Sequence, residues 1–224
     1  PGFLALIVLY TLVKERKKDK PAGTDTISPL SITKPKTSFD KRFILFLGVF
    51  ALFTLGNSSD FFLILRAQNV EAPLIEVVLM LVLFNLTYSL ISMPMGILSD
   101  KFGRRRVIIF GWLIYALVYF GFALASHIWQ IWVLFAVYGL YYGICEGAAK
   151  ALVADMVPAE KRGTAYGYFN GVVGLMALPA SLIAGWMWDA ISPAATFYFG
   201  AGLAFLAMMG LLLLVKEKPK ATAS

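Results

Sequence analysis

Charged residues, cysteine and histidine are all scarce in this sequence. Only 15% of the 224 residues are charged, and the chain contains one cysteine, Cys145, and one histidine, His127. Single copies exclude a disulfide framework and a zinc cluster of cysteines and histidines, and they leave Cys–His or Ser–His catalysis unsupported. We therefore expect a protein that is not an enzyme and that carries no metal and no cofactor.

Apolar residues are abundant where charge is lacking. Hydrophobic residues make up 59% of the chain and aromatic residues 15%, and the mean hydropathy is +0.76. A soluble globule of this size needs more polar surface, so the composition predicts a membrane protein whose surroundings are the lipid bilayer. The net charge of +7 falls between apolar runs, without the pattern of a nucleic-acid surface, so we expect no nucleic-acid partner.

Six apolar runs are long enough to cross a bilayer as helices, since about 20 residues suffice. They are residues 43–65, 74–98, 107–126, 131–154, 164–188 and 194–215, and together they define a transmembrane domain over 43–215. Residues 1–13 are apolar but too short to span, so we expect the end of a preceding helix whose beginning is missing. Residues 14–42 form a basic linker, and residues 216–224 form a tail.

The positions of the basic residues predict the orientation. All lysines and arginines between or beyond the predicted spans lie on one side, with the exception of Arg66 at an opposite loop. By the positive-inside rule, the linker and the C-terminus are cytoplasmic, and the chain is a multi-pass protein of the cell (inner) membrane.

The six spans divide into two groups of three, and the second group enters the membrane from the side opposite the first. This pattern predicts an all-α bundle of six transmembrane helices made of two inverted three-helix repeats. The first span of each group carries polar residues well inside it: GNSSD at 56–60, and Glu146 with Lys150. Interrupted spans at matching repeat positions indicate a binding site.

The charged segment GILSDKFGRRR at 96–106 lies between two spans and is expected to form a turn at the membrane surface. Gly96 allows close backbone approach, Gly103 permits a tight turn, and Asp100 can be held by an arginine or a helix N-terminus. The cluster Arg104, Arg105 and Arg106 resists crossing the bilayer, and plain anchoring is the simpler interpretation.

This segment resembles the signature loop of the major facilitator superfamily, and DMVPAEKRGTAYG at 155–167 is similar to a boundary that follows in many bacterial members. The resemblance implies the C-terminal six-helix half of such a transporter. The N-terminal half would then lie in the same polypeptide or in a separate fragment. It further implies a cytoplasmic gate in which Asp100 caps a helix of the opposite region and Arg104 meets Asp155.

The resemblance also implies a function. A small solute would cross by alternating access in a secondary active transporter, with proton-coupled efflux by antiport as the first choice and proton-coupled import by symport as the alternative. A non-transporting membrane scaffold or receptor with the same fold is an alternative of another class. Buried ionisable residues argue against it, because a scaffold has no need for them.

Two acids inside the spans are the candidates for proton coupling. A carboxylate at the position of Asp60 costs roughly 2.5–3.5 kcal/mol to insert unless it faces water or a partner. It therefore either lines a cavity with Asn57 and Ser58 or belongs to a structural hydrogen-bond network. Glu146 and Lys150 are four residues apart and share a helix face, so they either neutralise one another or contact solute and proton.

Further polar residues are candidates for the substrate cavity. Arg66 and Glu76 flank the same outer turn, which favours an ion pair at the rim over a substrate contact. The remaining cavity candidates are Asn85, Tyr88 and Asn170. Glycines recur every four residues at 139–147 and at 163–171, a spacing typical of closely packed membrane helices.

Overall fold

The computed structural model describes residues 39–215, which contain seven α-helices, one short 3-10 helix and no strand. The expected helix end at 1–13, the linker up to residue 38 and the tail at 216–224 lie outside the described residues. Asp40 caps the N-terminus of the first described helix, which begins at Lys41. Its carboxylate accepts a hydrogen bond from the backbone N–H of Arg42 at 3.3 Å, as a capping residue does.

The helices follow the predicted spans but extend beyond most of them. Their bounds are α2 Lys41–Gly56, α3 Phe61–Asn69, α4 Leu74–Phe102, α5 Arg104–Leu124, α6 Ile128–Met156, the 3-10 helix η1 Ala159–Lys161, α7 Arg162–Ala190 and α8 Pro193–Leu214. Six helical segments, with α2 and α3 taken together, are long and apolar enough to cross a membrane. The prediction of six spans is confirmed.

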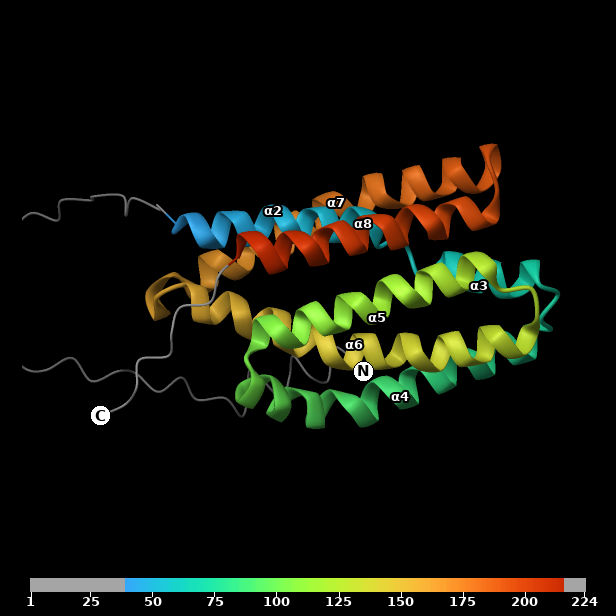
Figure 1. Cartoon of the computed structure of the whole chain (residues 1–224), viewed down its shortest axis with the longest axis horizontal. Helices are drawn as coiled ribbons and strands as arrows, with labels where there is room; N and C mark the ends of the chain where they lie inside the picture. The colour runs from blue at the N-terminus through green and yellow to red at the C-terminus, as the bar shows by residue number, and fades with distance from the viewer. Residues whose placement is uncertain (1–38, 216–224) are drawn as a thin grey trace, which may run out of the picture. The chain divides into compact units, whose positions relative to one another are not determined.

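The packing of the six spans follows the expected inverted repeat (Figure 1). The second helix of each group packs against the first helix of the other group, α4 against α6 and α7 against α2. The third helices do the same, α5 against α6 and α8 against α2, and they also pack against each other. Each group therefore contacts the other through equivalent helices, and both groups contribute to the interior.

The polar interruption at 56–60 breaks the first span into α2 and α3. The N–H of Asn57 turns back to the carbonyls of Phe53 and Thr54 at 3.0 Å each, and the next helix begins at Phe61 after Asp60. Asparagine and serine compete with the helix for backbone hydrogen bonds, which explains a break here. The expectation of a matching interruption in the second group is wrong, because α6 is continuous through Glu146 and Lys150.

The turn expected over the charged segment 96–106 is confined to one residue. Residues 96–102 belong to the last turns of α4, residues 104–106 begin α5, and Gly103 alone separates the helices. Gly103 has φ = 95°, a conformation that L side chains rarely adopt, so the expected role of this glycine is confirmed. A Cβ on Gly96 would meet no described atom within 4 Å, so close approach at Gly96 is not found within residues 39–215.

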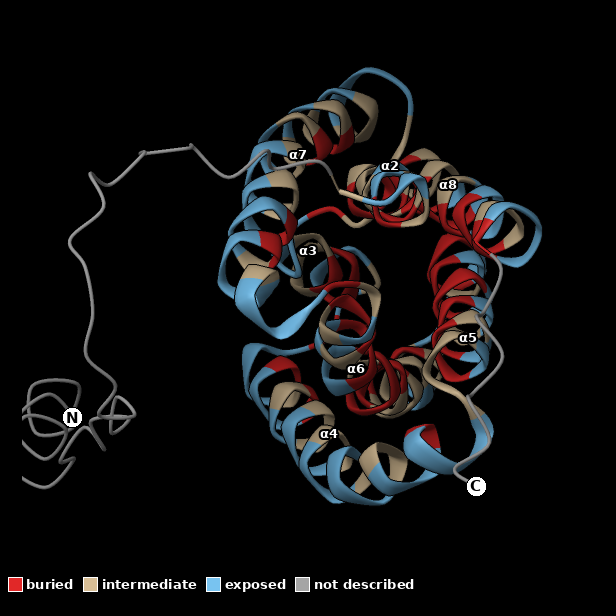
Figure 2. Ribbon diagram, turned by 90° about the vertical axis from the view of Figure 1, so that its left-hand side faces the viewer, coloured by how far each residue is buried: buried red, intermediate tan, exposed pale blue. Residues whose placement is uncertain are grey.

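Burial is distributed unevenly over the helices (Figure 2). The largest fully buried side chains include Trp112, Tyr115 and Tyr119 of α5 and Tyr138 of α6. In α4 and in α7, by contrast, only 11% of an apolar stretch of 18 residues is buried. An apolar helix face that nothing else in the described chain covers needs lipid or another protein surface against it.

The glycine pattern explains one helix contact and not the other. A Cβ on Gly139 would lie 2.6 Å from the carbonyl oxygen of Phe84, and one on Gly143 would lie 3.0 Å from that of Tyr88, so α6 packs closely on α4 through these glycines. The glycines of α7 at 163, 167 and 171, and Gly147, would meet no described atom within 4 Å. Their spacing therefore produces no close contact within residues 39–215.

Candidate functional site

A cavity of about 230 Å³ lies among α2, α5, α6 and α7. One part of its lining is aromatic, from Phe50, Phe53, Trp112, Tyr141, Tyr142 and Phe169. The other part is polar and consists of four residues that the sequence indicated as site residues, Asn57, Glu146, Lys150 and Asn170, together with Thr54. An apolar cavity with a few convergent polar groups is typical of a small-molecule site.

Glu146 and Lys150 form an ion pair on one face of α6, with 2.8 Å between Lys150 Nζ and Glu146 Oε1. The hydroxyl of Tyr88, from α4, donates a hydrogen bond to the other carboxylate oxygen, Oε2. The two charged side chains are 41% and 55% exposed within the described chain. Both interpretations of the pair, mutual neutralisation and availability to a ligand, are compatible with this geometry, because each group is held and still accessible.

Asp60 lies at the start of α3, where the broken first span meets α6. Its Oδ1 accepts a hydrogen bond from the Tyr138 hydroxyl at 2.6 Å, and its Oδ2 accepts one from the Tyr142 hydroxyl at 3.4 Å. Ser58, two residues earlier, is buried, and its hydroxyl has no hydrogen-bond partner among residues 39–215. Asn57 Oδ1 accepts from the Tyr115 hydroxyl at 3.2 Å. The helix break thus gathers polar groups beside tyrosines of α5 and α6, with Ser58 buried and Asp60 exposed within the described chain.

Two tyrosines at this site were missed by the sequence reasoning. Tyr138 and Tyr142 stand eight and four residues before Glu146, so Tyr138, Tyr142, Glu146 and Lys150 repeat every four residues and follow one stripe of α6. Tyr142 contacts Asp60 and also lines the cavity with Glu146. The four-residue spacing to the embedded acid was a signal that could have found them.

Arg66 does not form the expected ion pair with Glu76. Its Nε donates to the Phe122 carbonyl at 2.9 Å, and its Nη2 donates to the carbonyls of Ala123 at 3.2 Å and Ala125 at 2.8 Å. Glu76 Oε2 instead accepts from the indole N–H of Trp132 at 3.0 Å. The Arg66 guanidinium binds the carbonyls at the end of α5, because a helix C-terminus attracts a cation and its last carbonyls lack donors within the helix.

The other cavity candidates divide between the cavity and its surroundings. Asn170 lines the cavity beside Lys150, and Tyr88 reaches the site through its bond to Glu146. Asn85 is exposed and donates to the Leu81 carbonyl one turn earlier in α4, at 2.8 Å. It is absent from the cavity lining.

A second cluster of polar contacts joins α4, α5 and α6 at the end of the bundle where the basic residues gather. The guanidinium of Arg104 lies 2.7 Å from Asp155 Oδ2 and 3.1 Å from Asp100 Oδ1, and it donates to the Ala151 carbonyl at 2.6 Å. The contact between Arg104 and Asp155 is the one that the family resemblance implied. Asp100 is held by this arginine, four residues along the chain.

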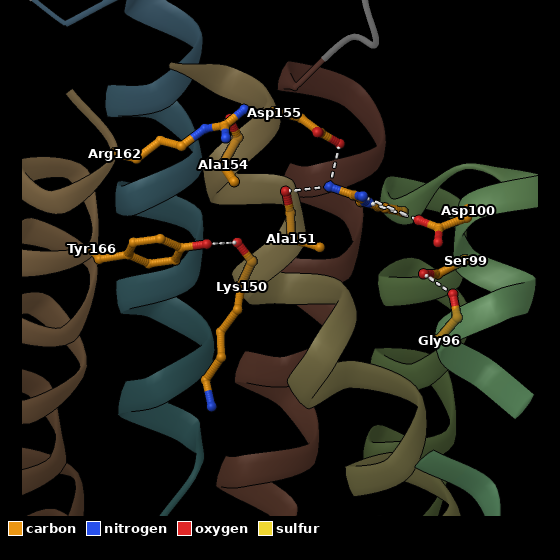
Figure 3. Close-up of polar contacts among 10 residues, drawn as sticks. Gly96, Ser99, Asp100, Lys150, Ala151, Ala154, Asp155, Arg162 and Tyr166 are labelled. Atoms are coloured by element: carbon orange, nitrogen blue, oxygen red, sulfur yellow. Dashed lines mark hydrogen bonds and ion pairs between the residues drawn. The ribbon is translucent and has the colours of Figure 1, made fainter. Parts of the chain in front are cut away.

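Arg105, the next residue, points to a different helix. Its side chain donates to the carbonyls of Leu211 and Leu212 in the last turn of α8, where orphan carbonyls accept such donors. The adjoining helix ends are also tied together (Figure 3): Arg162 donates to the Ala154 carbonyl at 3.3 Å, and Tyr166 donates to the Lys150 carbonyl at 3.0 Å. Hydrogen bonds from arginine side chains to backbone carbonyls therefore connect the helices at this end of the bundle.

The fold and the site together define a class of protein. A bundle of six membrane-spanning helices in two inverted three-helix repeats, with a broken first helix and embedded acids, is half of a transporter-type fold. Residues 45–224 match the family model of the Major Facilitator Superfamily. The chain belongs to this superfamily.

Individual relatives agree with the family assignment. The chain is 40% identical over 219 residues to an uncharacterised MFS-type transporter of Methanocaldococcus jannaschii, a match that covers 95% of the chain and 52% of the relative. It is 25% identical over 146 residues to the quinolone resistance protein NorA of Staphylococcus aureus, covering 65% of the chain and 37% of the relative. The chain therefore spans about half, or less, of the length of these relatives.

A solved structure matches the fold. The crystal structure of a peptide transporter POT, an E310Q mutant in complex with sulfate, aligns with a TM-score of 0.55 and 20% sequence identity. The alignment covers 76% of this chain and 37% of the transporter. At this identity the likeness concerns the fold alone.

Proposed function

We propose that the chain is the C-terminal half of a secondary active transporter that moves a small solute by alternating access. The observation that carries the proposal is the cavity with Glu146 and Lys150 on its wall, inside a bundle of membrane-spanning helices. Ionisable side chains at membrane depth are costly and mark solute or ion pathways. Membership of the superfamily supports the same conclusion.

The partner of this chain is the N-terminal six-helix half, in the same polypeptide or as a separate fragment. The support is the low burial of α4 and α7, since these helices offer long apolar faces that the described chain leaves uncovered. In this arrangement the solute lies between the two halves, and lipid covers the remaining outer surface. The basic end, with Arg104 and Arg162, faces the cytoplasm of a cell (inner) membrane.

Protons drive transport in this proposal, with Asp60 and Glu146 as the groups that exchange them. Both carboxylates accept hydrogen bonds from tyrosine hydroxyls, so each has a partner while its proton is absent. Efflux by antiport is the first choice, and the likeness to a quinolone resistance protein supports it. Import by symport would use the same carboxylates.

The test uses the complete transporter, containing both halves, in vesicles with an imposed pH gradient. Asp60→Asn should abolish gradient-driven solute flux while the protein remains folded and inserted, and Glu146→Gln should abolish its pH dependence. Asp189→Asn, at an exposed acid near the end of α7, is the matched control and should keep wild-type flux. Wild-type, pH-dependent flux in both site variants would contradict the coupling role, and the sign of the flux separates antiport from symport.

The contact cluster around Arg104 serves as a cytoplasmic gate latch in this mechanism. It joins the last turns of α4 and α6 to the first turn of α5. In this proposal the contacts are made in one of the two states and stabilise that state. Asp100→Asn should shift the balance between inward-facing and outward-facing states without changing membrane insertion. Accessibility labelling from each side measures this balance, and an unchanged labelling pattern would contradict the latch.

A further inference from the structure

The cavity combines an aromatic wall with a single ion pair at its edge. Phe53 and Trp112 stack with ring centroids 4.4 Å apart and planes inclined by only 5°, and Phe169 adds a further ring. These three rings are at most 5% exposed, whereas Phe50 and Tyr142 of the same lining are only partly buried and offer apolar surface to a planar ligand. The ion pair of Glu146 and Lys150 supplies the charged groups of the lining.

The depth of the pair limits which ligand charges it accepts. Glu146 stands ten residues before the end of α6 at Met156, which is about 15 Å along a helix. A ligand with one charge would engage one member of the pair and leave the other without its counter-charge at this depth of a membrane-spanning helix, which is costly. A ligand with both charges forms two new ion pairs and leaves neither group alone.

The geometry of the pair also limits how far apart the ligand charges can be. Lys150 Nζ and Glu146 Oε1 are 2.8 Å apart, so their charges match those of a ligand that carries its own two charges side by side. An ammonium group has three donors, and the bond to Glu146 uses one of them. In Figure 3 the Lys150 side chain points away from the helix ends at Asp155, toward the middle of the bundle.

We propose that this cavity binds a compact aromatic zwitterion, with an ammonium and a carboxylate on the same or neighbouring carbon atoms. The ligand carboxylate pairs with Lys150, the ligand ammonium pairs with Glu146, and the ring lies against Phe50 and Tyr142. The assignment names the solute class of the proposed function and rests on the cavity being its solute site.

The test compares four probes that share a phenyl ring and differ in charge: phenylalanine, phenethylamine, 3-phenylpropanoate and ethylbenzene. Binding to the complete transporter in detergent, with no gradient, is measured by calorimetry. We expect phenylalanine to bind about tenfold more tightly than either singly charged probe, as expected for one additional charged hydrogen bond. Equal affinity for all four probes, or a preference for ethylbenzene, would overturn the assignment.

Single neutralisations give a second, sharper readout. Glu146→Gln leaves Lys150 without its counter-charge, so the preference should change to 3-phenylpropanoate, and Lys150→Met should change it to phenethylamine. The exchanged pair Glu146→Lys with Lys150→Glu keeps both charges and should keep the preference for phenylalanine. Glu160→Gln, at an exposed acid of η1, is the control. A preference that none of these changes alters would contradict the ion pair as the ligand contact.

The binding assay tests this inference and the flux assay tests the proposed function, so the two can be refuted independently. Transport driven by a pH gradient without the zwitterion preference would refute this inference and leave the proposed function in place. Zwitterion binding with the predicted charge pattern, but no flux in vesicles, would refute transport and leave the binding site in place.

Discussion

Replacing Arg66 by methionine removes a buried guanidinium that joins the outer half of the broken span to the end of α5. Arg66 is 9% exposed, and it donates to the carbonyls of Phe122, Ala123 and Ala125 at 2.8–3.2 Å. These carbonyls belong to the last turn of α5 and its C-cap, which have no partners within their own helix. Methionine keeps much of the apolar stem and supplies no donor.

The magnitude follows from the three carbonyls that lose their donor. An acceptor left unsatisfied in a buried place costs about 1–3 kcal/mol. The site lies at a helix end, where water can reach part of it, so the low end of the range applies to each carbonyl. We therefore expect Arg66→Met to lower the free energy of unfolding by about 3 kcal/mol.

The assay is reversible unfolding in SDS of the complete transporter and its variants. Arg66→Lys keeps the charge with fewer fixed donors, so it should be intermediate. Arg106→Met, at an exposed arginine at the start of α5, is the control and should change stability little. Unchanged stability of Arg66→Met, together with loss of solute binding, would refute the structural role and restore Arg66 as a substrate contact.

Two further predictions concern contacts between helices. Gly139→Ala should destabilise the packing of α6 on α4 by about 1–3 kcal/mol, because its Cβ would lie 2.6 Å from the Phe84 carbonyl oxygen. Gly48→Ala, which meets no described atom within 4 Å, should be neutral in the same SDS titration, and equal effects would contradict close packing. Trp132→Phe removes the indole N–H that donates to Glu76 at 3.0 Å and should cost about 1 kcal/mol. Glu76→Gln keeps an acceptor and should cost less, so the reverse order would refute that hydrogen bond.

The spans and their break could be predicted because both depend on local composition. A run of about 20 apolar residues is favourable in lipid wherever it occurs, and GNSSD is unfavourable for a continuous helix in almost any surroundings. The segment 96–106 was predicted less well. Its charged residues suggested a loop, yet charged side chains at a helix end can reach polar surroundings while the backbone remains helical, so only Gly103 leaves the helix.

Part of the candidate site was visible in the sequence and part was not. Glu146 and Lys150 are neighbours on any helix, so their pairing follows from the spacing alone. The partners of Asp60 could not be predicted, because Tyr138 is 78 residues away in the chain. The prediction for Arg66 was wrong because it weighed the nearest acid, Glu76, and not the carbonyls at the end of a distant helix.

The sequence by itself determined the membrane class, the number of spans, their grouping into two sets of three, and the embedded acids. These properties depend on transfer into lipid and on residues within a few turns of one another. Only the tertiary structure decided which groups meet: Asp60 with two tyrosines of α6, Arg66 with the end of α5, and the ion pair with an aromatic cavity. Such contacts depend on distances between helices far apart in the chain, and a linear pattern of apolar and polar residues does not contain those distances.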